Sequence, residues 1–155
     1  MNDKLITIKG VLKVFPKDRS RLKKKKKPNE EQTIVVNVSN DFSHYYSNFL
    51  RKEFGLFLEP PPFGSHVTVN NGLEEISNLE LKEEYLNSLN GKVITLQYDP
   101  EIYRHWEFFA VKVYSNELNT IRKNLGLSPK RSFHITIGKL HPNSKKQSVL
   151  NRVIP

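Results

Sequence analysis

Two tetrapeptides of one pattern, His-apolar-Thr-apolar, occur in this 155-residue chain, one in each half. They run from His66 to Val69 and from His134 to Ile137. In a β-strand successive side chains point to opposite faces, so each tetrapeptide would place its His and Thr on one face and its two apolar residues on the other. Both segments are therefore predicted to be strands, with the apolar residues packed on one face and the His and Thr available for reaction on the other.

Two imidazoles that face one site can act as a general acid and a general base, because the unperturbed pKa of His is about 6.5. A Thr hydroxyl two residues further along can bind an anionic oxygen between them. This set suits cleavage of a phosphodiester, with one His taking a proton from the attacking oxygen and the other protonating the leaving oxygen. The predicted catalytic residues are His66, Thr68, His134 and Thr136.

A metal site is not predicted, because no carboxylate or third His stands at ligand spacing beside the two histidines. No cofactor is predicted either. A single His-x-Thr in a strand is more often part of an ordinary half-buried sheet. The interpretation as a catalytic pair therefore depends on the duplication and on the equivalent placement of the two units.

The elements that would position these residues also repeat, because a strand, a helix, a glycine and a strand follow one another twice. The first copy is predicted at 33–39, 41–53, Gly55 and 66–70, and the second at 106–114, 116–125, Gly126 and 132–140. Further predictions are an edge strand at 5–15, a partly helical segment at 73–89 and a strand at 92–98. This order predicts an α+β fold, a bilobal domain with pseudo-two-fold symmetry over 1–155.

Alternation also predicts which side chains line the substrate site. Trp106, Phe108 and Lys112 share one face of the strand at 106–114, and alignment of the two copies places Thr33 and Asn37 at the equivalent face of the first half. Trp106 or Phe108 could stack on a nucleobase, and Lys112 could hold a phosphate. The alternative is that the aromatic residues are sheet core.

The positions of other polar residues in the sequence predict their roles or their exposure. Lys139 follows the second tetrapeptide and is a further candidate for phosphate binding. His44 is predicted to be exposed on a helix, whereas His105 precedes a strand near the site. The acidic residues between Glu74 and Glu84 are predicted to form a solvated helix face.

Composition narrows the class of protein. A formal charge of +9 favours polyanionic partners, and the absence of Cys excludes disulfides and a thiol nucleophile. No apolar run is long enough to span a membrane and no secretion signal is recognised, so a cytoplasmic protein is expected.

Eight Lys or Arg residues and one acid lie between Lys17 and Lys27. They predict a mobile basic loop at about 17–31, either a solvated surface loop or an arm that gathers nucleotides or RNA.

The paired tetrapeptides resemble the signature of the two-histidine phosphoesterase superfamily, over about residues 33–140. The resemblance implies a bilobal α+β fold with two antiparallel sheets around a cleft and helices outside. It also implies metal-independent cleavage of cyclic phosphodiesters or RNA-like linkages. By this resemblance His66 and His134 would take the acid and base roles, and Thr68 and Thr136 would bind phosphate.

Within that superfamily the small, Lys-rich and Asn-rich chain is similar to bacteriophage anti-CBASS enzymes, which degrade cyclic di- and trinucleotide signals of bacterial defence. The similarity implies a cyclic oligonucleotide or RNA-like substrate, cleavage of 3′–5′ linkages and action in the host cytoplasm. Two alternatives stay open: an RNA 2′,3′-cyclic phosphodiesterase, and a non-catalytic nucleotide-binding or RNA-binding module. No membrane association and no obligate protein partner are expected.

Overall fold

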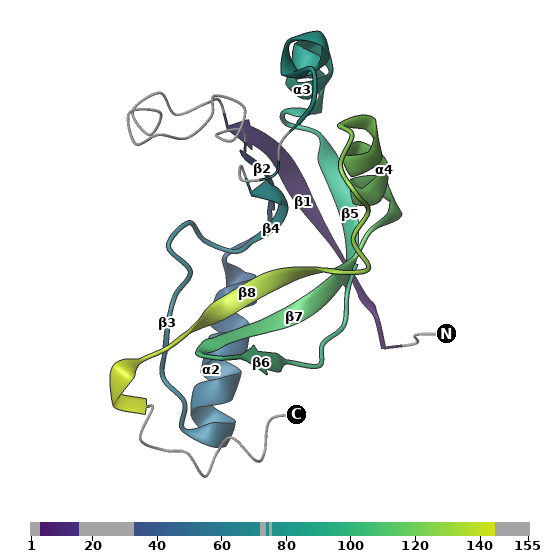
Figure 1. Ribbon diagram of the computed structural model, residues 1–155. Coiled ribbons are helices and arrows are strands. Elements are labelled where there is room, and N and C mark those ends of the chain that lie inside the picture. The colour runs from purple at the N-terminus through teal and green to yellow at the C-terminus, as the bar shows by residue number, and fades with distance from the viewer. Residues whose placement is uncertain (1–3, 16–32, 72–73, 75, 145–155) are drawn as a thin grey trace.

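The computed structural model describes residues 4–15, 33–71, 74 and 76–144 (Figure 1). The predicted loop at 17–31 and the chain from 145 onward lie outside the described residues. The strands are β1 (Ile6–Phe15), β2 (Thr33–Asn37), β3 (Leu58–Glu59), β4 (His66–Asn71), β5 (Val93–Tyr98), β6 (Tyr103–His105), β7 (Phe108–Tyr114) and β8 (Phe133–Leu140). The helices are α2 (Asp41–Phe54), α3 (Glu83–Leu89) and α4 (Asn116–Asn124), with 3-10 turns η2 (Leu79–Lys82) and η3 (Pro142–Ser144).

The strands form one antiparallel sheet in the order β3-β8-β4-β2-β1-β5-β7-β6, and a further pairing of β7 with β8 closes six of them into a ring. At two places in this ring, which we call seams, neighbouring strands are joined by only one or two residue pairs. The pair Val67↔Ile135 joins β4 to β8, and two residue pairs join β5 to β7. The fold is thus mixed α and β with a barrel-like sheet, in place of the two separate sheets that we expected. The two residues of each of these pairs are far apart in sequence, so no local pattern predicts the pairing.

Most of the predicted elements are confirmed, with boundaries shifted by one or two residues. Gly55 ends α2 in the left-handed region with φ 67°, as a glycine C-cap does. At the start of α4 the Ser115 hydroxyl accepts a hydrogen bond from the Leu118 amide. The prediction of β1 as an edge strand is wrong, because β2 pairs with it on one side and β5 on the other. Alternation shows which face of a strand is buried but not how many partners it has.

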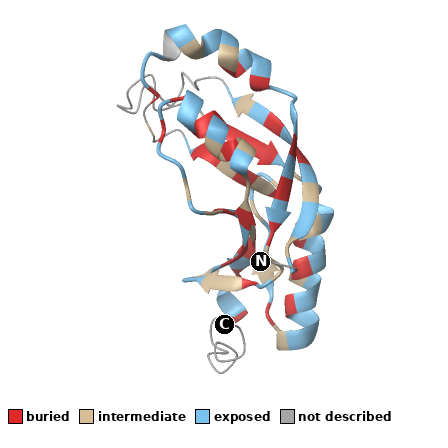
Figure 2. Cartoon of the chain, turned by 90° about the vertical axis from the view of Figure 1, so that its right-hand side faces the viewer, coloured by how far each residue is buried: buried red, intermediate tan, exposed pale blue. Residues whose placement is uncertain are grey.

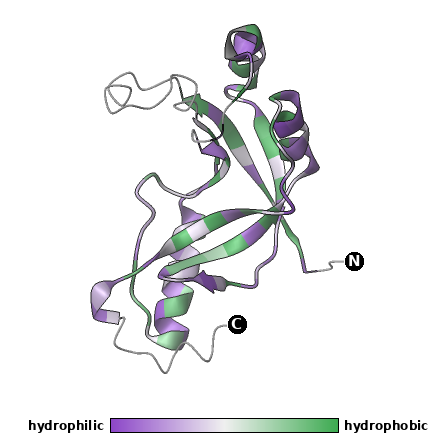
Figure 3. Ribbon diagram, viewed as in Figure 1, coloured by the Kyte–Doolittle hydropathy of each residue, from purple (hydrophilic) through white to green (hydrophobic). Residues whose placement is uncertain are grey.

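The helices cover the apolar face of the sheet. In Figure 1, α2 lies behind β7 and β8 at one end of the molecule, and α3 and α4 lie near β1 and β5 at the other. Buried residues run along the strands and along one side of each helix (Figure 2). Apolar and polar residues alternate along the strands (Figure 3). None of the helices in the described part of the chain is long and apolar enough to cross a membrane.

The two copies of the repeat pair their strands in the same register. Asn37 lies opposite His66 in the first copy, and Lys112 lies opposite His134 in the second. In both copies the register then shifts by one residue at the last position of the tetrapeptide, as a β-bulge does. The internal repeat found in the sequence is therefore also a repeat of strand pairing.

Candidate active site

The seam between β4 and β8 brings the two tetrapeptides together. Val67 and Ile135, the second residues of the two tetrapeptides, are direct partners there, and both side chains are fully buried. Residues that are direct partners in an antiparallel pair share a face of the sheet, and their neighbours along each strand point the other way. The His and Thr residues on either side of Val67 and Ile135 therefore project from the opposite face.

The register at this seam sets the four predicted catalytic residues in a two-by-two array. Counting outward from the pair Val67↔Ile135 in an antiparallel register places His66 level with Thr136 and Thr68 level with His134. Direct partners have Cβ atoms about 5 Å apart and diagonal neighbours are about 7–8 Å apart, and this register makes His66 and His134 diagonal neighbours on one face. We call the surface that carries these four residues the histidine face.

The chain just before β4 orients the His66 ring. Its Nδ1 lies 2.9 Å from the Gly64 carbonyl oxygen, which can only accept, so Nδ1 carries a proton and Nε2 is the atom left for proton transfer. The next amide, that of Ser65, donates to the Asn40 side-chain oxygen. Gly64 has φ +76°, and a Cβ there would meet the same Asn40 oxygen at 2.6 Å. This turn requires glycine, and it fixes the ring's direction.

His134 has a different electrostatic environment. Desolvation against the sheet lowers its pKa from the usual 6.5, although the side chain keeps contact with solvent. The charges of Lys130, His66 and His105 lower the pKa further. The neutral form of His134 is therefore favoured at neutral pH, which suits a general base.

Lys112 and Phe108 lie on the histidine face, by the register of β7 with β8. Lys112 is the direct partner of His134, and its Nζ lies 5.9 Å from the centre of the Tyr103 ring. Phe108 is 44% exposed and is the direct partner of Lys139, whose Nζ lies 5.9 Å from the Phe108 ring centre. The sheet therefore continues the face beyond the two-by-two array with cationic and aromatic side chains.

The structure corrects the placement of Trp106. It is in the turn between β6 and β7, with φ +57° and 81% of its surface exposed, rather than in the strand that we predicted from 106 to 114. Arg104 Nε donates to the Trp106 carbonyl at 2.6 Å, and the His105 ring stacks on the indole with centroids 5.4 Å apart. The sequence showed no sign of β6, which is only three residues long, so the hairpin was missed.

Lys139 is on the histidine face, but its ammonium group also lies near the Glu107 carboxylate. Its Nζ lies 3.7 Å from a carboxylate oxygen of Glu107, and both side chains remain partly exposed. His44 is exposed on α2, as predicted. Among the described residues, no group of three or more His, Cys, Asp or Glu side chains is placed to hold a metal ion.

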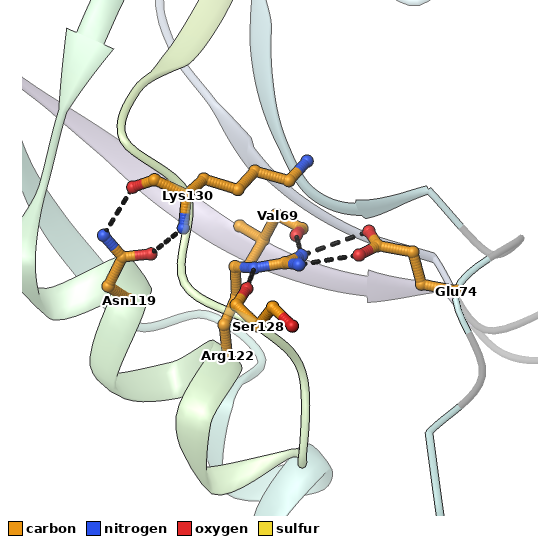
Figure 4. A network of polar contacts seen from close by, with 6 residues as sticks. All are labelled: Val69, Glu74, Asn119, Arg122, Ser128 and Lys130. Atoms are coloured by element: carbon orange, nitrogen blue, oxygen red, sulfur yellow. Dashed lines mark hydrogen bonds and ion pairs between the residues drawn. The ribbon is translucent and has the colours of Figure 1, made fainter.

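A buried arginine network behind the site was missed in the sequence (Figure 4). Arg122 of α4 is 2% exposed and donates to the carbonyl of Val69, the last residue of the first tetrapeptide, at 2.6 Å. It also donates to the Ser128 carbonyl and to both carboxylate oxygens of Glu74. The hydrogen bonds from the Arg122 guanidinium hold the pKa of Glu74 below its usual range. The prediction of Glu74 on a solvated helix face is therefore wrong.

Arg122 has one signal in the sequence: it follows Leu118 by four residues, so it falls on the apolar stripe of its helix. Lys130, in the segment leading to β8, was also missed. Its backbone is held by two hydrogen bonds to the Asn119 side chain, 2.8 and 2.9 Å long. Lys130 contributes to the lowered pKa of His134. It is therefore a residue that acts on the site through charge.

Comparison with known proteins agrees with this geometry. A family model described as "Swiss Army Knife, 2H phosphoesterase domain" matches residues 34–143, which include both tetrapeptides and all of the repeat after Thr33. The chain belongs to this family of two-histidine phosphoesterases. No curated protein and no solved structure gives a match.

Proposed function

We propose that this protein is a phosphodiesterase that cleaves 3′–5′ linked nucleotides without a metal, with His66 and His134 as the catalytic pair and Thr68 and Thr136 as phosphate ligands. The observation that carries the proposal is the register at Val67↔Ile135, which sets each His beside the other strand's Thr on one face. Membership in the 2H phosphoesterase family supports the reaction class.

The surroundings of the two histidines support separate roles. The lowered pKa of His134 favours the neutral base, which removes a proton from the attacking hydroxyl. That oxygen attacks phosphorus, the bond to the leaving oxygen breaks, and His66 Nε2 donates a proton to the leaving oxygen. The Gly64 carbonyl accepts from Nδ1 in both charge states of the His66 ring, so the ring keeps its orientation through the proton transfer.

The substrate's own 2′-OH is the proposed nucleophile, which gives a 2′,3′-cyclic phosphate, and water is the alternative nucleophile. The two Thr hydroxyls donate to the phosphoryl oxygens as negative charge develops on them. Lys112, the direct partner of His134, adds a cation beside that charge. The acid, base and phosphate-binding roles are thus all assigned to side chains of this protein.

For the substrate we propose a cyclic di- or trinucleotide signal, so that the protein counters bacterial CBASS defence. The formal charge of +9 and the cationic and aromatic residues on the histidine face support an oligonucleotide. Phe108 and Trp106 are proposed to stack on bases, and Lys112 and Lys139 to contact phosphates. The equivalent strand registers of the two copies support the proposal that the halves act as lobes related by a pseudo-two-fold axis.

The test is product analysis by mass spectrometry with EDTA present, over cyclic GMP-AMP, a cyclic trinucleotide, linear dinucleotides and RNA ending in a 2′,3′-cyclic phosphate. Cleavage of the cyclic signals supports the proposal. Turnover restricted to 2′,3′-cyclic ends would assign an RNA 2′,3′-cyclic phosphodiesterase instead, and tight binding without turnover would assign a nucleotide-binding module.

The matched variants are His66→Ala and His134→Ala, with His44→Ala on the exposed side of α2 as the control. Loss of either catalytic His is expected to lower kcat by about 10²-fold or more with the fold intact by circular dichroism. His44→Ala is expected to behave as the parent protein. Full activity in both catalytic variants would refute the assigned roles.

A further inference from the structure

One row of side chains leads from the catalytic histidines into the first half of the molecule. Asn37 of β2 is the direct partner of His66, and Val11 of β1 is the direct partner of Asn37. Direct partners share a face of the sheet and have Cβ atoms about 5 Å apart. Asn37 therefore lies on the histidine face, one strand beyond His66. Lys9 and Lys13 are two positions to either side of Val11 along β1, outside this row.

Asn37 offers an accessible carboxamide at this place. The residue is exposed at the end of β2, although the three residues before it in the strand are buried. In the part of the chain that the structure describes, no group hydrogen-bonds to this carboxamide. A carboxamide carries no charge and can both donate and accept, so it suits a hydroxyl group as its ligand.

The second half carries a different group at the equivalent position. Lys112 is the direct partner of His134, as Asn37 is of His66. The next residue of the first-half row, Val11, is 47% exposed and uncharged. The two sides of the two-by-two array therefore differ, because a cation flanks His134, whereas a neutral amide followed by an apolar side chain flanks His66.

We propose that Asn37 is a specificity-determining residue that binds the ribose of the leaving nucleoside, the one attached to the leaving oxygen. The inference rests on the proposed function, in which His66 protonates that oxygen. In a 3′–5′ linkage the leaving oxygen is the 5′ oxygen of the next ribose, so the group beside His66 is a sugar. The Asn37 carboxamide hydrogen-bonds the 2′-OH of this ribose, which both donates and accepts. The preferred substrate is thus a linkage between two ribonucleosides.

The test compares two 3′–5′ linked adenosine dinucleotides that differ only in the sugar of the leaving nucleoside, which is ribose in one and 2′-deoxyribose in the other. Both keep the 2′-OH that attacks phosphorus, so the proposed nucleophile is the same. Binding is measured by NMR titration in the His134→Ala background, where turnover is expected to be lost. This protein is expected to bind the ribose form about fivefold more tightly, as one hydrogen bond provides.

Asn37→Ala is expected to remove this preference by weakening the binding of the ribose form alone. The matched control is Asn48→Ala, which removes the same group from an exposed position of α2 and should leave both affinities unchanged. Lys112→Ala is expected to weaken both dinucleotides by the same factor, because its ammonium group is proposed to contact phosphate. Circular dichroism checks that each variant keeps the fold.

A ribose preference that survives Asn37→Ala would overturn the proposal, as would equal affinity of the His134→Ala protein for the two dinucleotides. Loss of the preference in Lys112→Ala but not in Asn37→Ala would also overturn it, because the leaving nucleoside would then lie on the other side of the array. No binding of either dinucleotide would contradict the proposed function itself. Since the sugar preference is measured by binding, failure of catalysis is distinguishable from failure of the ribose contact.

Discussion

Replacing Arg122 with Met removes one buried charge and four hydrogen bonds while nearly preserving side-chain volume. The guanidinium is 2% exposed, and it joins Val69 in β4, Ser128 before β8 and the Glu74 carboxylate. Loss of one partner of a buried ion pair costs about 3–5 kcal/mol. The Glu74 side chain is 30% exposed and regains water, so the lower part of this range is expected.

At about 2–4 °C per kcal/mol for a chain of this size, Arg122→Met is expected to lower the Tm by roughly 6–12 °C. Thermal and urea unfolding followed by circular dichroism measure the effect. Arg122→Lys keeps the charge but not the planar fork, so it is expected to recover only part of the loss. The control is Lys123→Met, an exposed neighbour on the same helix, for which a change within about 0.5 kcal/mol is expected.

Glu74→Gln tests the same pair by pH. Because Arg122 lowers the folded-state pKa of Glu74, this carboxylate adds stability above its unfolded pKa of about 4.3, and the gain is lost as pH falls through the folded-state value. Glu74→Gln is expected to remove that part of the acid destabilisation. A Tm for Arg122→Met equal to that of the parent protein would refute the structural role of the network.

Three further predictions concern the site. Lys130→Gln removes a charge that lowers the pKa of His134, so the acidic limb of kcat/KM is expected to move to higher pH, whereas Lys52→Gln on α2 should leave it in place. Gly64→Ala adds a Cβ at φ +76° against Asn40, so kcat should fall by about tenfold with a small change in KM, and an unchanged kcat would contradict the orienting role of Gly64. The pH–rate profile of the parent protein should have its acidic limb below about 6.5, and a limb above that value would argue against His134 as the base.

Several features of the site follow from the sequence. The period-two alternation in each tetrapeptide correctly sets His66 and Thr68 on one face and Val67 on the other. The glycine that ends α2 and the apolar stripe of α4 predicted those helices. These signals are local: they depend on backbone geometry and on burial of one face, which neighbouring residues reveal.

Contacts between distant residues decided the rest. The single residue pair between β4 and β8 and the closing of the ring have no local signal, because each depends on which strand lies beside which. The hydrogen-bond partners of Arg122 could not be predicted for the same reason, since they include the distant residue Val69.

The sequence by itself determined which groups the duplicated strands carry, namely two imidazoles, each with a hydroxyl two residues along. Only the tertiary structure decided their arrangement. It pairs Val67 with Ile135, and counting outward from this pair places each His level with the Thr of the other half. The physical reason is that alternation along a strand is a property of the backbone, whereas register across a sheet is chosen by the packing of the whole core.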